Sequence, residues 1–106
     1  MREFRISRGT GSPITLEEWV AALNKLEGVR LTGGNNPRAK HSGNAEVYSP
    51  KFAEWVEAFR WTKTGEAVFK SAAGDVVVRT AYQLARELRA GVIDKDGQPV
   101  AEASLM

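Results

Sequence analysis

The 106-residue chain is 42% hydrophobic and 26% charged. This length and composition are typical of one folded domain over residues 1–106 and exclude a disordered chain. It contains no cysteine, so disulfides, thiolate metal sites and cysteine nucleophiles are excluded. Fifteen Lys and Arg against thirteen Asp and Glu leave a net charge of only +2, which gives little support for nucleic-acid binding.

The N-terminal residues predict a strand. Residues 3–7, Glu-Phe-Arg-Ile-Ser, alternate so that Phe4 and Ile6 share one face. The residues after Met1 lack the apolar core of a signal peptide, and no later apolar run approaches the length that spans a membrane. We therefore expect a soluble cytoplasmic protein without a membrane segment.

The strongest local signal predicts a helix over residues 16–27. Thr15 and Glu18 have the spacing of a capping box, and Ile14 and Trp19 have that of a hydrophobic staple. Apolar residues recur along one face of this helix, which predicts that the face packs on the core. That face consists of Leu16, Trp19, Val20, Leu23 and Leu26.

Two short strands are predicted after Gly28, which supplies a left-handed end to the helix. They are Val-Arg-Leu-Thr at 29–32 and Ala-Glu-Val-Tyr-Ser at 45–49. The polar segment between them is rich in glycine and asparagine. We expect it to form an inter-strand loop that is mobile from Gly33 to Gly43, because few apolar groups fix it.

Residues 50–58 fit two structures. The apolar residues have helical spacing and Ser49-Pro50 resembles a helix start, yet an irregular strand fits as well. A short helical turn and an irregular strand therefore remain alternatives. Trp19 belongs to the staple and Trp61 to the hairpin described next, so only Trp55 among the tryptophans has no structural role in this interpretation.

A hairpin is predicted around residues 63–65. With a three-residue loop and Gly65 in the left-handed conformation, the apolar residues of the two strands share one side. This register pairs Phe59 with Phe69 and Trp61 with Ala67.

The C-terminal part predicts a second helix and a final hairpin. Asp75 is the expected N-cap of the helix and Gly91 its left-handed stop. Asp96 and Gly97 are expected to form the turn of the hairpin, with Pro99 in an edge strand. The buried face of the helix is predicted to consist of Val77, Ala81, Leu84, Ala85 and Leu88.

This order of elements predicts an α+β fold. Strands that are neighbours in sequence favour an antiparallel sheet, and each helix has one apolar face to bury. We therefore expect four or five short strands in an antiparallel sheet, with the two amphipathic helices packed on one face.

One segment has the outline of a phosphate-binding loop. Gly34 is followed after four residues by Ala39, Lys40 and His41. Such a loop needs glycine at the position of Ala39 and a hydroxyl at that of His41. Both are missing, so no nucleotide cofactor is predicted.

The sequence offers no metal site or catalytic set either. An Asp94 calcium loop would have Pro99 at the position of its glycine and Leu105 at that of its glutamate. His41 is the only histidine, which excludes a histidine-based triad and a two-histidine metal site. We therefore expect no cofactor and no enzymatic activity.

The candidate contact residues are cations. Arg38 and Lys40, with His41 beside them, lie in the predicted loop, and Arg60 and Lys63 lie on the predicted hairpin. Loops held by a rigid scaffold often carry binding residues. These five residues are the predicted partner-binding site, and their charge favours an acidic partner.

Four stretches together resemble a group of small uncharacterised bacterial proteins of about this length: Ile-Ser-Arg at 6–8, Pro-Ile-Thr-Leu-Glu-Glu-Trp at 13–19, Phe-Arg-Trp-Thr-Lys-Thr-Gly at 59–65, and Leu-Ala-Arg-Glu-Leu-Arg-Ala-Gly-Val-Ile-Asp-Lys-Asp-Gly at 84–97. The resemblance implies a bacterial source and an α+β fold, and genes of this sort are sometimes suspected of encoding immunity or accessory proteins. It transfers no catalytic residue.

These observations favour a non-catalytic cytoplasmic domain that binds another protein, with an immunity or antitoxin-like role as its most concrete form. The first alternative is a weak nucleic-acid-binding protein that uses the basic loop and hairpin. An enzyme that relies on Asp, Arg and Tyr alone is the second alternative, and a deep polar pocket would favour it. The residues of the nucleic-acid alternative are Arg30, Arg38, Lys40, Arg60 and Lys63.

Overall fold

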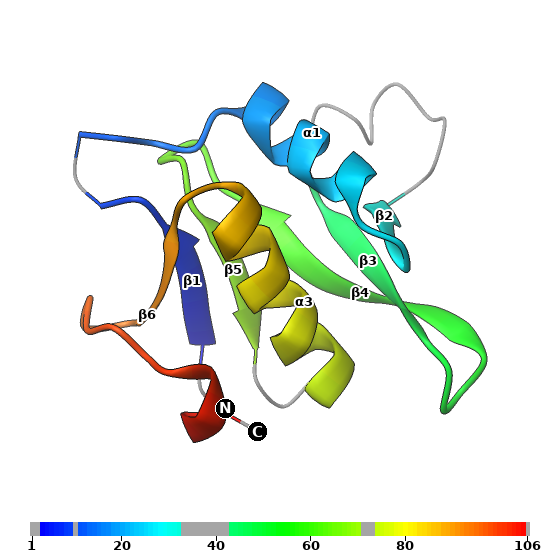
Figure 1. Cartoon of the computed structure of the whole chain (residues 1–106). Helices are drawn as coiled ribbons and strands as arrows, with labels where there is room; N and C mark the ends of the chain where they lie inside the picture. Colours follow the sequence, from blue (N-terminus) through cyan, green and yellow to red (C-terminus); the bar gives the residue numbers. More distant parts are fainter. Residues whose placement is uncertain (1–2, 10, 33–42, 71–73, 106) are drawn as a thin grey trace.

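The structure is a computed structural model that describes residues 3–9, 11–32, 43–70 and 74–105. In this part of the chain, six strands form one antiparallel sheet in the order β2-β3-β4-β5-β1-β6. Figure 1 shows both helices on the same face of the sheet. The elements are β1 (Glu3–Ser7), α1 (Leu16–Lys25), β2 (Val29–Leu31), β3 (Ala45–Ser49), β4 (Glu54–Trp61), β5 (Ala67–Lys70), α3 (Asp75–Glu87), β6 (Gly91–Asp94) and the 3-10 helix η2 (Glu102–Ser104).

The predicted α+β class and antiparallel sheet are confirmed, but the predicted number of four or five strands is wrong. Two of the six strands are very short edge strands: β2 has three residues and β6 has four. Both lie in segments that were predicted to be extended, and they are ordered by pairing with β3 and β1 respectively.

The core lies between the sheet and the two helices, and aromatic rings form its centre. The ring centroids of Phe4 and Phe69 are 5.8 Å apart. The ring centroid of Phe59 lies 5.7 Å from that of Phe69 and 5.9 Å from that of Trp19. All four side chains are buried. Each buried side chain of this size contributes about 1.5–3 kcal/mol, so these rings are a major part of the stability.

Strand β4 resolves the ambiguity of residues 50–58. The chain turns at 50–53 and then forms a strand, with Val56 opposite Val47 and Phe59 opposite Ala45. Three steps along β4 therefore match two steps along β3, which is a β-bulge. The bulge keeps both Val56 and Phe59 on the core face, and this explains why their spacing resembles that of a helix.

The predicted β4–β5 hairpin is confirmed in its register. Trp61 is opposite Ala67, and Gly65 has a φ of +85°. The hairpin loop also holds the entry to α1, because the Gly65 carbonyl accepts a 2.9 Å hydrogen bond from the Ile14 amide. A Cβ at Gly65 would lie 2.3 Å from the Cβ of Pro13, so only glycine allows this approach.

Helix α1 begins as predicted and ends two residues earlier, at Lys25 rather than residue 27. Both hydrogen bonds of the capping box between Thr15 and Glu18 are present. Leu26 is already extended, because the chain turns toward β2 there. On the predicted apolar face, Trp19 and Leu23 are buried as expected. Leu16, Val20 and Leu26 are only half-buried, and Ala22 is buried in addition.

An arginine reinforces this cap. Arg8 donates to both carboxylate oxygens of Glu18, at 2.7 and 2.6 Å, and its Nη2 also donates to the Pro13 carbonyl at 2.6 Å. The hydrogen bond from Arg8, followed by that from the Thr15 amide, lowers the pKa of Glu18 from 4.5 to about 2. The turn after β1 is thereby tied to the first turn of α1.

The second predicted helix is confirmed, but both of its predicted ends are wrong. Gly74 is the N-cap, and Asp75 is the first helical residue. At the other end, Arg89 adopts the left-handed conformation with a φ of +53°. The Ala90 amide then donates to the Ala85 carbonyl at 2.8 Å, which completes a Schellman-type end. Gly91 is free for strand pairing because the turn is already complete.

The buried face of α3 is as predicted. It consists of Val77, Ala81, Leu84, Ala85 and Leu88.

The final hairpin is present, with Gly97 in a left-handed conformation at a φ of +81°. Its return arm pairs through a single bridge, Ile93 to Pro99, rather than as a full strand. Proline lacks the amide that continued pairing would need. Within the ranges that the structure describes, no helix is long and apolar enough to cross a membrane.

Candidate functional site

The face of the sheet opposite the helices presents an aromatic cluster, defined here as Arg30, Tyr48 and Trp55. Tyr48 and Trp55 are directly opposite each other on β3 and β4, and their ring centroids are 5.5 Å apart. The guanidinium carbon of Arg30 on β2 lies 3.9 Å from the centroid of the Trp55 ring. Three neighbouring strands thus bring a tyrosine, a tryptophan and an arginine together.

Glu46 fixes the arginine of this cluster. Its Oε1 accepts a 2.6 Å hydrogen bond from the Nε of Arg30, its cross-strand neighbour. The arginine is therefore held between a carboxylate and an aromatic face, both of which restrict its rotamers. The side chain of Arg30 nevertheless remains 50% exposed and Tyr48 38% exposed, so the cluster is accessible.

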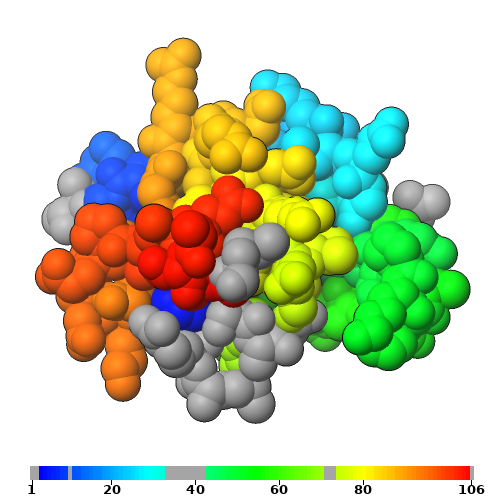
Figure 2. Space-filling model, turned by 60° about the horizontal axis from the view of Figure 1, so that its bottom comes forward, coloured from blue at the N-terminus to red at the C-terminus, as the bar shows by residue number. Residues whose placement is uncertain are grey.

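The helix side of the same β3–β4 hairpin forms a groove with the start of α3. The groove has a volume of about 630 Å³, and its lining includes Val56 and Phe52 of the hairpin region and Val76 of α3. Figure 2 shows the green hairpin tip projecting beside the yellow first turn of α3. The groove and the aromatic cluster occupy the two sides of one projecting hairpin.

Exposed apolar area is concentrated around this hairpin. Among the described residues, the large hydrophobic side chains that remain exposed are Tyr48, Phe52 and Val76, with Phe52 at 64%. All three belong to the aromatic cluster or to the groove lining. Such concentration marks interaction sites more often than scattered apolar residues do.

The turn of the hairpin also contains a strained residue. Ala53 has a φ of +51°, in the left-handed region that residues other than glycine rarely adopt. Backbone strain of this kind costs about 1–3 kcal/mol and is concentrated at functional sites. Arg89 at the end of α3 has a similar φ of +53°, so at Ala53 the strain shows only that the hairpin turn is tightly constrained.

The predicted site residues are only partly placed. Arg60 is exposed on the open sheet face and Lys63 is exposed in the β4–β5 loop. Arg38, Lys40 and His41 lie outside the described residues. Arg60 is five residues along β4 from Trp55, about 17 Å at about 3.3 Å per residue, so it does not belong to the aromatic cluster. The site that these five residues were predicted to form stays a prediction.

Charges of both signs alternate over the open sheet face. Glu46 lies directly opposite Glu57, an arrangement of like charges that disfavours strand pairing. Among the described strand and hairpin residues of this face, carboxylates and cations are equal in number. The carboxylates are Glu3, Glu46, Glu57 and Glu66, and the cations are Arg5, Arg30, Arg60 and Lys70.

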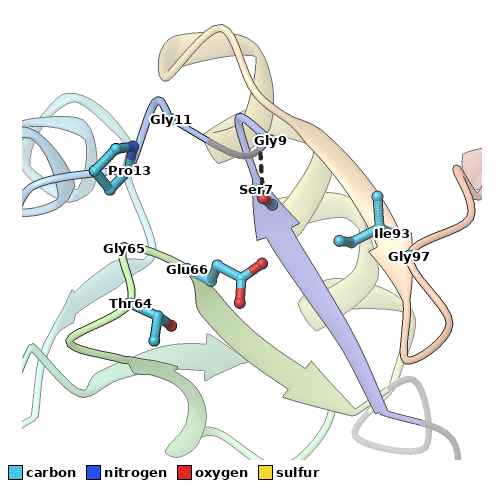
Figure 3. A pocket seen from close by; sticks show the side chains of 9 residues that line it. All are labelled: Ser7, Gly9, Gly11, Pro13, Thr64, Gly65, Glu66, Ile93 and Gly97. Carbon is cyan, nitrogen blue, oxygen red and sulfur yellow. Dashed lines mark hydrogen bonds between the residues drawn. The ribbon is translucent and has the colours of Figure 1, made fainter.

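A second hollow of about 550 Å³ lies at the end of the sheet, beside the loop that leads into α1. Figure 3 shows Glu66 and Ser7 pointing toward each other there, with glycine backbone around them. Both groups already have partners: Glu66 accepts from Arg5 at 3.2 Å, and the Ser7 hydroxyl oxygen accepts from the Gly9 amide at 3.1 Å. These hydrogen bonds link the side chains of the hollow to β1 and to the turn that follows it.

Metal binding finds no support in the described part of the chain. No group of three or more His, Cys, Asp or Glu side chains there is placed to hold an ion. The Asp94 carboxylate instead accepts hydrogen bonds from the amides of Asp96 and Gln98, at 2.9 and 3.0 Å. The Asp94 carboxylate thus stabilises the turn of the final hairpin.

Comparison of the chain with protein-family models and with curated proteins gave no match. The resemblance to small bacterial proteins therefore stays a prediction, and the candidate site depends on geometry alone. Tyr48 and Phe52 were not predicted as contact residues, because 45–49 was predicted only as a strand and the structure of 50–58 was left between two alternatives. The available signal was Trp55, the one tryptophan without a structural role.

Proposed function

We propose that this protein is a non-catalytic protein-binding domain whose contact surface is the aromatic cluster of Arg30, Tyr48 and Trp55. The observation that carries the proposal is the close contact of these three side chains on a sheet face that the helices leave uncovered. Tryptophan, tyrosine and arginine are the residue types most enriched among side chains that dominate binding energy. Their clustering favours a protein partner.

The rigidity of the cluster supports the same proposal. Glu46 holds Arg30, and Arg30 in turn covers one side of the Trp55 ring. A surface that is ordered before binding loses less conformational entropy when a partner arrives. Glu46 also lies directly opposite Glu57 in the sheet. This pair of like charges lowers the stability of the sheet, and a sheet selected for stability alone would avoid it.

Charge favours protein over nucleic acid as the partner. The open face carries Glu46 and Glu57 within the same strands as Tyr48 and Trp55. Glu46 is paired with Arg30, but Glu57 forms no ion pair with a described residue and would repel a phosphate backbone, whereas a protein surface of mixed charge can complement it. We also propose that Arg38 and Lys40 contact an acidic surface of the partner. This contact is separate from the aromatic cluster.

The most concrete form of this function is an immunity or antitoxin-like protein that binds and inhibits one cytoplasmic partner. A small non-catalytic domain with one exposed cluster suits such a task, because inhibition requires only that the domain cover the partner's working surface.

Affinity capture from the source cell tests the proposal, with wild-type protein, Trp55→Ala and Gln83→Ala as baits after nuclease treatment. Gln83 is exposed on α3, away from the cluster, and alanine suits a helix interior. We expect one protein to be captured by wild type and Gln83→Ala and to be lost with Trp55→Ala. Capture that is unaffected by Trp55→Ala, or that disappears with nuclease, would contradict the proposal.

A further inference from the structure

The groove between the β3–β4 hairpin and α3 has the features of a peptide-binding site. Val47 and Val77 contribute buried apolar surface to its lining, and Phe52 and Val76 contribute exposed apolar surface. Its volume of about 630 Å³ lies within the range of about 300–1,000 Å³ that is usual for ligand pockets. This space is suited to a large apolar side chain together with its neighbours.

The charges of the groove select the occupant. Glu54 contributes a carboxylate from the hairpin and Asp75 one from the first turn of α3. Both side chains are exposed, and neither forms an ion pair with a described residue. The one cation in the lining, Lys51, has its Nζ 5.5 Å from the centroid of the Phe52 ring. The groove thus carries a net negative charge and disfavours fatty acids, phosphates and nucleic acid.

The start of α3 adds hydrogen-bond donors. Its N-cap is Gly74, which has no side chain and makes no capping hydrogen bond. The amides of a first helical turn have no acceptor within their own helix. A backbone carbonyl of an occupant can serve as that acceptor, which an apolar small molecule or a lipid tail cannot do.

From these features we infer that the groove binds a basic segment of the partner protein, with one large apolar side chain between Phe52 and Val76 and a Lys or Arg beside Glu54 and Asp75. This inference depends on the proposed protein-binding function and specifies the partner's chemistry. The aromatic cluster on the opposite side of the hairpin then provides a second, separate contact.

Selection from a library of random twelve-residue peptides displayed on phage tests the inference with the intact protein as target. We expect enriched sequences to contain an aromatic or long aliphatic residue within about three positions of a Lys or Arg. Synthetic versions should bind Val76→Ser several-fold more weakly, and the double variant Glu54→Gln, Asp75→Asn likewise. Val76 is exposed and serine is tolerated in the first turn of a helix, so Val76→Ser should remain folded.

Two controls make the outcome decisive. Gln83→Ala should bind the peptides like wild type, and amide chemical-shift changes on peptide addition should include Phe52 and Val76. Failure to enrich any sequence, enrichment of acidic sequences, or shift changes elsewhere would overturn the inference. If the groove variants retain the cellular partner and Trp55→Ala loses it, the proposed function stands and the groove inference fails. The reverse pattern would support the groove and reject the aromatic cluster.

Discussion

The indole nitrogen of Trp19 donates a 2.7 Å hydrogen bond to the carbonyl of Gly43. Trp19 is fully buried in α1, and Gly43 is the first described residue after the segment 33–42. The bond therefore fixes the start of the β3 arm against the helix. The mobility predicted from Gly33 to Gly43 stays a prediction, and Gly43 is the one residue of that segment that the structure describes. Residues 33–42 of the predicted loop lie outside the described residues.

Gly43→Ala should therefore destabilise the protein strongly. Gly43 has a φ of +72°, and an added Cβ would lie 2.7 Å from the Cβ of Trp61. Backbone strain and overpacking each cost about 1–3 kcal/mol, so we expect a loss of about 2–6 kcal/mol in denaturant unfolding. Gly28→Ala is the matched control, because its φ is +78° and its added Cβ meets nothing within 4 Å. Equal losses in the two variants would contradict the packing argument.

Arg89→Gly should stabilise the protein by about 1 kcal/mol. Arg89 adopts the left-handed conformation that ends α3, and glycine adopts it without steric cost. Gly91 does not have a positive φ and its added Cβ would meet open space, so Gly91→Ala should change stability by less than about 0.5 kcal/mol. Thermal melts of both variants distinguish this account from the sequence-based expectation, under which Gly91→Ala would be clearly destabilising.

The Arg8–Glu18 pair predicts a stability component that depends on acid pH. The pKa of Glu18 is lowered from 4.5 to about 2 in the folded protein, so its contribution is complete above pH 4.5 and is lost as the pH falls toward 2. Glu18→Gln should lack this component. Unfolding midpoints of wild type and Glu18→Gln should therefore converge between pH 4.5 and 2. Parallel pH profiles of the two proteins over that interval would refute the assignment.

Thr15→Ala should cost about 1 kcal/mol, because the Glu18 amide loses its side-chain acceptor. Urea denaturation measures the loss. The acidic first-turn residue Glu17 provides a control, since no hydrogen bond or ion pair of its side chain supports the cap, and Glu17→Gln should have a smaller effect. An unchanged midpoint for Thr15→Ala would show that Arg8 alone fixes this turn.

The local elements were predictable where one local interaction determines them. The capping box at Thr15 and Glu18 and the left-handed Gly65 are such cases, because each depends on residues close in sequence. The ends of α3 were not predictable in this way. Arg89 occupies a conformation usually taken by glycine because burial of Leu88 and pairing of Gly91 with Ser7 determine where the chain must turn.

The candidate site depended still more on tertiary contacts. The bulge that places Phe59 on the core face arises from pairing with Ala45, and no local pattern distinguishes it from a helical turn. Arg30 meets Trp55 only because β2, β3 and β4 are adjacent in the sheet. Sequence analysis identified Trp55 as unexplained but could not assign its neighbours.

The most direct test of the central claim is the dissociation constant of the captured partner for wild type, Trp55→Ala and Gln83→Ala, measured by calorimetry. A side chain that dominates an interface costs about 2 kcal/mol or more when truncated, which corresponds to about a thirtyfold weaker complex. We expect that loss for Trp55→Ala and wild-type affinity for Gln83→Ala, with both variants giving well-dispersed NMR spectra. A folded Trp55→Ala protein that binds within about twofold of wild type would contradict the account.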